Sequence, residues 1–170
     1  MDTDTLKEMR DLWSATIEKD GGYCPCCDRW GKIYRRSLNA TMARQLMWLV
    51  QARDRGDGWV HVPSTAPAWL LRTPQLPTLT LWGLIEGAPS TTKLASSGLW
   101  KPTDKGIAFA QNRLSVQKYV YAYNNTRVDS DGEDISILDA LGSKYNYQEI
   151  MANYDGSESS FVEDSYGNDT

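Results

Sequence analysis

The sequence predicts an α+β fold built around one main core. Apolar residues recur at intervals of three and four in several segments, which is the period of an amphipathic helix, whereas residues 116–123 alternate as in a strand. The length of 170 residues fits one domain with an appendage or a tail. The expected segments are an N-terminal helix, a cysteine turn with a basic strand, the main domain, a strand and helix extension, and an acidic disordered tail, at residues 1–22, 23–38, 39–115, 116–152 and 153–170.

The first segment contains an amphipathic helix over residues 3–19, which ends at Gly21 and Gly22. Its apolar stripe needs a partner, which is either the main domain or the same helix of a second copy. A homodimer through this helix is therefore one expectation. The stripe consists of Leu6, Met9, Leu12, Trp13 and Ile17.

The second segment carries the clearest chemical signature of the chain. Its three cysteines are an odd number within four positions, which suits metal binding or reduced thiols better than a disulfide framework. Cys24 and Cys27 have the C-x-x-C spacing that lets two thiolates bind one zinc ion, and the segment resembles the knuckle of zinc-ribbon proteins, with Asp28 where those knuckles usually have glycine. Tetrahedral zinc needs further ligands, and the candidates are Cys26, the only histidine His61, Asp28, or the same segment of another chain.

Basic and aromatic side chains interleave on the strand expected at residues 32–38. Lys32, Arg35 and Arg36 either rest on a sugar-phosphate backbone or form the solvent face of an edge strand. A helix capped by Asn39 follows, and a short strand at residues 59–63 contains His61.

Two further helices are expected before residue 83. The second helix begins near Thr65, with Pro67 in its first turn and Trp69, Leu70 and Leu71 facing inward, and the third begins with Thr73 as its cap and Pro74 at its first position. The third helix would enter a DNA major groove, with Gln75, Thr78 and Thr80 exposed and Arg72 at the entrance. It contains no Arg or Lys, which argues against reading of a specific base sequence.

Two motifs resemble winged helix-turn-helix regulators of the MarR and PadR kinds. The first, L-x-x-x-G-L-I-x, spans residues 79–86, and the second, G-x-W/Y-x-x-T-x-x-G-x-x-F, spans residues 98–109. The resemblance covers about residues 40–114 and implies two wing strands, a wing loop at residues 88–97 that carries Lys93, and a closing helix capped by Thr103. It also implies a core that includes Leu76, Leu79, Trp82, Leu84, Trp100 and Phe109.

The extension is expected to contain a strand at residues 116–123 and a hairpin-type turn at residues 124–125. Acids alternate before a glycine in residues 129–134, but the terminal Glu of a calcium loop is absent, so an exposed acidic turn is expected there. Ser136 should cap a helix, and residues 147–151 should form another helical turn.

Charge is segregated along the chain although the net charge is only −4. Residues 1–27 carry a net −3, residues 28–118 a net +8, and the remainder a net −9. The basic middle favours a phosphate-bearing partner, while uneven solvated surface is the simpler alternative.

The leading functional hypothesis is therefore a nucleic-acid-binding regulatory protein, with DNA as the expected partner. Lys32, Arg35, Arg36, Arg72, Lys93 and Lys101 would neutralise phosphates, while Gln75, Thr78 and Thr80 would touch bases. The alternative is a protein-binding adaptor or an inhibitor of a host enzyme, which would use the acidic and aromatic surfaces. The chain is also similar in its overall look to small uncharacterised phage and prophage proteins.

Enzymatic activity is not expected, because one histidine and no phosphate loop leave no recognisable catalytic set. No run approaches the ~18 apolar residues that a membrane span needs, and no segment near the start resembles a signal peptide. A cytoplasmic protein without a membrane partner is the expectation.

Overall fold

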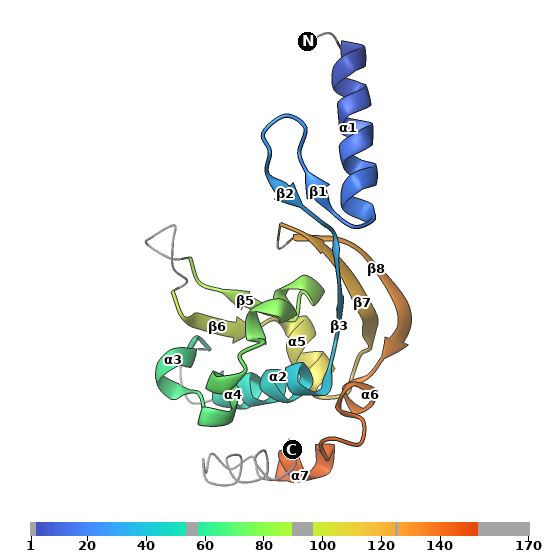
Figure 1. Cartoon of the computed structure of the whole chain (residues 1–170). Helices are drawn as coiled ribbons and strands as arrows, with labels where there is room; N and C mark the ends of the chain where they lie inside the picture. Colours follow the sequence, from blue (N-terminus) through green and yellow to red (C-terminus); the bar gives the residue numbers. More distant parts are fainter. Residues whose placement is uncertain (1–2, 54–57, 90–96, 125, 153–170) are drawn as a thin grey trace.

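The computed structural model is an α+β fold, with helices and three small antiparallel sheets in the part of the chain that it describes (Figure 1). The described residues are 3–53, 58–89, 97–124 and 126–152. Lys93, most of the expected wing loop and the expected tail therefore lie outside the described residues. Among the helices in these ranges, none is both long and apolar enough to cross a membrane.

Helices and strands, singly or in short groups, alternate along the described part of the chain. The helices are α1 (Thr3–Glu18), α2 (Ala40–Ala52), α3 (Val62–Thr65), α4 (Ala68–Arg72), the 3-10 helix η2 (Leu76–Trp82), α5 (Asp104–Ala110), α6 (Ile137–Leu141) and α7 (Tyr147–Ala152). The strands are β1 (Gly22–Tyr23), β2 (Trp30–Gly31), β3 (Tyr34–Ser37), β4 (Val60–His61), β5 (Ile85–Gly87), β6 (Leu99–Pro102), β7 (Val116–Tyr123) and β8 (Thr126–Ile135). They pair as β1–β2, β3–β7–β8 and β4–β6–β5.

Helix α2 forms the centre of the core. Asn39 caps it as predicted, because the Asn39 side-chain oxygen accepts a hydrogen bond from the Met42 backbone N–H at 2.8 Å. Elements from both halves of the chain, namely η2, β6, α5 and α6, pack around this helix. The fully buried side chains include those of Leu46, Leu49, Leu70, Leu76, Leu79, Trp82, Leu84, Phe109, Ile137 and Leu141.

The second predicted helix is α4 and begins at Ala68, and a separate short helix, α3, replaces the end of the strand predicted at residues 59–63. Thr65 ends α3 instead of beginning a helix, and Ala66 is extended, as is usual for a residue that precedes a proline. Pro67 then stands at the N-cap of α4. Trp69 and Leu70 are buried as predicted, but the prediction for Leu71 was wrong, because its side chain is exposed.

The third predicted helix is a 3-10 helix, and it begins at Leu76 rather than Pro74. Pro77 lies in its first turn and supplies no backbone N–H, and the β-branched Thr78 and Thr80 also disfavour a regular α-helix. Gly83 ends the helix in the left-handed region with φ of 71°. The apolar positions of η2 nevertheless face the core, as the spacing predicts.

Hydrogen bonds and close packing among Gly83, Leu84, Thr103 and Gly106 hold the end of η2 against the start of α5. The Thr103 hydroxyl donates a hydrogen bond to the Gly83 carbonyl at 2.6 Å and accepts one from the Gly106 N–H at 3.1 Å, so Thr103 caps α5 as predicted. The Thr103 N–H also donates to the Leu84 carbonyl at 3.0 Å. A Cβ on Gly106 would overlap the Leu84 carbonyl oxygen and lie 2.8 Å from the carbonyl carbon. The backbones approach so closely that only glycine fits there.

One prediction about the β3–β7–β8 sheet was wrong. Asn124 has φ of 51° between β7 and β8, which agrees with the predicted turn. Residues 129–134 are not an exposed acidic turn, because they belong to the long strand β8. β8 pairs with β7 with two register shifts, and Gly132 lies in the left-handed region. The acidic side chains of β8 are exposed along the outer edge of the sheet. Ser136 caps α6 as predicted, through a capping box with Asp139.

Helix α1 and the β1–β2 hairpin project together beyond the start of β3, and we call this unit the arm (Figure 1). The Ile33 N–H donates a hydrogen bond to the Ile17 carbonyl at 2.8 Å. Gly31 lies under the Trp13 ring, because a Cβ added to Gly31 would be 2.6 Å from the ring. The C-terminal half of α1 is therefore fixed to the hairpin, whereas Leu6 and Leu12 remain exposed.

We predict that Gly106→Ala destabilises the fold by about 2–3 kcal/mol or more, because the added methyl must displace the Leu84 backbone. The free energy of unfolding, measured by urea titration, tests this. Gly22→Ala is the control, because its methyl would meet only the end of the Thr16 side chain and should cost less. Equal stability of the two variants would contradict the close packing described for Gly106.

Candidate nucleic-acid groove and cysteine turn

A groove of about 590 Å3 lies between β2, β3, η2 and β6, and we call it the basic groove. Four of the residues predicted to contact nucleic acid line it, namely Lys32, Arg36, Thr78 and Thr80. The described lining residues include no Asp or Glu. Residues that are far apart in the sequence thus form one surface of positive charge and hydroxyl groups.

Aromatic rings accompany the two cations. Lys32 Nζ lies 5.6 Å and Arg36 Cζ lies 5.7 Å from the centre of the Tyr34 ring. Trp30 and Tyr34 are 48% and 46% exposed, so their rings are open to a ligand. Trp100 also lines the groove, and its ring packs over Gly87, where an added Cβ would come within 2.9 Å of it. The groove therefore offers stacking surfaces beside its positive charges.

The pairing of β3 with β7 separates the two neighbouring arginines. Successive side chains of a strand point to opposite faces, so Arg36 shares the groove side with Tyr34 while Arg35 turns to the other face. Arg35 Cζ lies 3.6 Å from the centre of the Tyr119 ring there. Of the two predicted contacts, only Arg36 lies in the basic groove.

The other predicted nucleic-acid contacts lie outside this groove. The Gln75 side-chain oxygen accepts a hydrogen bond from Asn39 Nδ2 at 2.9 Å, which places Gln75 in a network at the start of α2. Lys101 Nζ lies 3.2 Å from Glu86 and 4.7 Å from the centre of the Trp59 ring. Arg72 is exposed at the end of α4, and Lys93 lies outside the described residues.

The cysteine turn, residues 24–29, connects β1 to β2. The Cys24 N–H donates to the Arg29 carbonyl at 2.8 Å, and the Asp28 N–H donates to the Cys24 carbonyl at 2.9 Å. Asp28 has φ of 58°, so it adopts the left-handed conformation that favours glycine. Hydrogen bonds from the backbone N–H groups of Cys26 and then Cys27 lower the pKa of the Cys24 thiol.

The chain does not gather a complete metal-ligand set around these thiols in its described residues. Cys27 and Cys26 contact Cys24, but no group of three or more His, Cys, Asp or Glu side chains is arranged to hold a metal ion there. The predicted ligand His61 belongs to β4, whose partner strand is β6, and its Nδ1 lies 2.6 Å from the Ser64 hydroxyl. Two thiolates at C-x-x-C spacing remain the ligands that one copy offers.

Comparison with protein-family models, curated proteins and solved structures gave no match.

Sequence reasoning did not assign Trp30 or Trp100 to the groove. Trp100 was predicted to be a core residue, and it packs half-buried against the core while it also lines the groove. Trp30 follows the cysteine turn directly and pairs with Tyr23 across the hairpin. The alternation of basic and aromatic residues from Trp30 to Arg36 was the available signal.

We predict that Cys24 ionises at lower pH in the folded protein than in the unfolded chain. The physical cause is the donation of backbone N–H groups to its sulfur, which stabilises the thiolate and lowers the pKa. The measurement is the pH dependence of alkylation in metal-free Cys26→Ser/Cys27→Ser protein, where the same backbone donors persist and Cys24 is the only thiol left. The same variant unfolded in urea is the control, and a folded midpoint at or above the unfolded one would contradict this cause.

Proposed function

We propose that this protein binds nucleic acid in the basic groove and holds mainly the sugar-phosphate backbone. The observation that carries the proposal is the meeting of Lys32 and Arg36 with exposed aromatic rings in a groove whose described lining contains no acid. Neither cation has a carboxylate partner within the described part of the chain. Phosphate binding by such cations releases counterions, and aromatic rings stack on bases of any sequence.

Binding without strong sequence preference follows from the side chains that η2 presents. This helix contributes Thr78 and Thr80 to the groove but no Arg or Lys. The Thr80 hydroxyl already donates to the Pro77 carbonyl at 2.7 Å, so it is left mainly as an acceptor. Bidentate contacts of Arg or Lys to guanine, which are the commonest specific contacts, are thus not available from η2.

We further propose that residues 39–115 form a winged helix-turn-helix unit of the kind found in cytoplasmic regulators. The element order supports this, because α2, β4, the α3–α4 pair, η2, β5, β6 and α5 follow one another along the chain. The sheet order β4–β6–β5, in which the first strand pairs with the last, supports it as well. In this arrangement β5 and β6 are the wing strands.

The proposed role is binding without catalysis. The described residues that line the groove include no histidine, cysteine or carboxylate that could act as a base or a nucleophile. Their hydroxyl, cationic and aromatic groups suit recognition of a charged polymer.

We predict that Arg36→Gln weakens nucleic-acid binding and lowers its dependence on salt, because one phosphate contact is lost. The slope of log K against log salt should fall by about 0.9 for duplex DNA or about 0.7 for a single strand. Fluorescence anisotropy between ~50 and ~200 mM salt measures both quantities. Arg35→Gln removes the same charge from the opposite face of the strand and should leave the slope unchanged.

Two results would reject this function. One is the absence of binding to duplex and single-stranded probes at ~50 mM salt, where cationic contacts are strongest. The other is an equal loss of affinity in both arginine variants, which would place binding outside the basic groove.

We also predict that Tyr34→Leu weakens binding of a single-stranded probe by about 1–3 kcal/mol, because a base loses its stacking surface. Tyr121→Leu is the matched control, since Tyr121 pairs with Arg35 on the outer face of the same sheet. Competition titrations with a labelled oligonucleotide give both affinities. Unchanged affinity in Tyr34→Leu would show that the ring does not contact a base.

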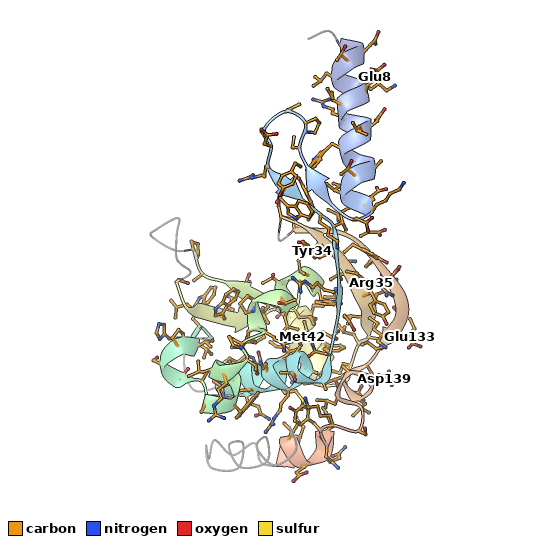
Figure 2. All side chains as sticks on the ribbon, in the orientation of Figure 1. Glu8, Tyr34, Arg35, Met42, Glu133 and Asp139 are labelled. Atoms are coloured by element: carbon orange, nitrogen blue, oxygen red, sulfur yellow. The ribbon has the colours of Figure 1, made fainter. Side chains whose placement is uncertain are left out.

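An acidic outer strand favours a protein partner as the second candidate function. Asp129, Asp131 and Glu133 are exposed on β8, and Glu133 lies at the outer side of the sheet (Figure 2). Such a surface suits a basic face of a host protein, as an adaptor or inhibitor would require. The nucleic-acid titrations distinguish the two functions, because this surface repels phosphate.

A further inference from the structure

The arm leaves part of an apolar helix face exposed. Trp13, Thr16 and Ile17 contact the hairpin, whereas Leu12 is 59% and Leu6 is 38% exposed. Both leucines precede Trp13, Thr16 and Ile17 along α1. A helix of 16 residues is only about 24 Å long, so this face alone is a small surface for stable association.

The cysteine turn of the same arm supplies half of a tetrahedral zinc site. Cys24 and Cys27 have the required spacing, and the left-handed Asp28 closes the turn as in a knuckle. The described residues of one copy provide no group that completes the set, and His61 is held in the β4–β6 sheet by its strand pairing. Cys24 and Cys27 of two copies would together provide four thiolates.

We propose that two copies of this chain join through their arms, with one zinc ion bound by Cys24 and Cys27 of both copies and the exposed faces of the two α1 helices packed against each other. The metal site is incomplete without a second copy of the chain. The partner that covers the exposed face of α1 is therefore the α1 helix of that second copy. Each half of the contact is insufficient alone, because two thiolates do not fill a tetrahedral site and the exposed leucines bury little area. Helix α1 carries two basic residues beside four acidic ones, so opposite as well as like charges can meet when two copies pair; these residues are Lys7 and Arg10, and Asp4, Glu8, Asp11 and Glu18.

The choice of ligands makes Cys26 a matched control. All three cysteines are reduced and close together in the turn, but Cys26 lies outside the C-x-x-C spacing. A metal site shared by Cys24 and Cys27 therefore loses half of its thiolates in a Cys24→Ser or Cys27→Ser protein and none in a Cys26→Ser protein. The inference does not depend on nucleic-acid binding.

The test uses the full chain under reducing conditions, with zinc content measured by elemental analysis and mass by sedimentation or light scattering. The expected result is one zinc ion for two chains in a dimer, which a chelator converts to monomer and added zinc restores. Cys24→Ser and Cys27→Ser should remain monomeric at the same zinc concentration, and Cys26→Ser should dimerise like the unaltered protein. The thermal unfolding of the main domain should be the same in all three variants, which excludes general misfolding.

Two further variants test the contact between the α1 helices. Leu12→Lys preserves helix propensity and should weaken the zinc-bound dimer on the order of tenfold, because an apolar side chain is no longer buried. Leu71→Lys changes an equally apolar, exposed side chain on α4 and should leave the dimer unchanged. Equal dimer affinity in both variants would overturn the helix contact.

Three results would overturn the shared metal site. They are one zinc ion per monomer, no zinc bound by the reduced chain, and a dimer that the chelator does not dissociate. Loss of zinc in Cys26→Ser to the same extent as in Cys24→Ser would overturn the proposed ligand set.

Discussion

The register between β3 and β7 is the constraint on which the groove depends. Tyr34 pairs with Ala122 and Arg36 with Val120, so Tyr34 and Arg36 share the face that meets η2. A shift of one residue would send these side chains to the outer face and bring Arg35 inward. The buried Val120 and Ala122 fix the register, because their side chains must remain in the core. The same pairing joins the basic strand of residues 23–38 to the C-terminal extension.

Local signals in the sequence predicted much of the fold. Asn39, Thr103 and Ser136 cap helices through hydrogen bonds over three residues, and such contacts need no information from distant parts of the chain. The apolar spacing of η2 also identified Leu76, Leu79 and Trp82 as core residues although the helix type was wrong. Pro77 and the threonines of η2 favour a 3-10 helix over the predicted α-helix. The length of β8 depends on its pairing with β7, which the acidic composition of β8 does not reveal.

The candidate site was less accessible to sequence reasoning because it is assembled by long-range contacts. Lys32, Arg36, Thr78 and Thr80 were named from their residue types, but only the fold shows that they meet. Gln75 was expected to face solvent, and its side chain instead joins Asn39 at the start of α2. Trp30 connects the two proposals, since it belongs to the arm and also lines the groove. A dimer joined through the arms would therefore carry two basic grooves near its metal site.

Crosslinking tests the location of nucleic-acid binding most directly. Ultraviolet irradiation of the protein with an iodouracil-substituted oligonucleotide attaches the bases to nearby aromatic side chains, and mass spectrometry identifies the attachment sites. Binding in the basic groove predicts crosslinks at Trp30, Tyr34 or Trp100, all of which line it. Crosslinks confined to residues outside the groove, such as Tyr119 or Tyr121 on the outer face, would contradict it.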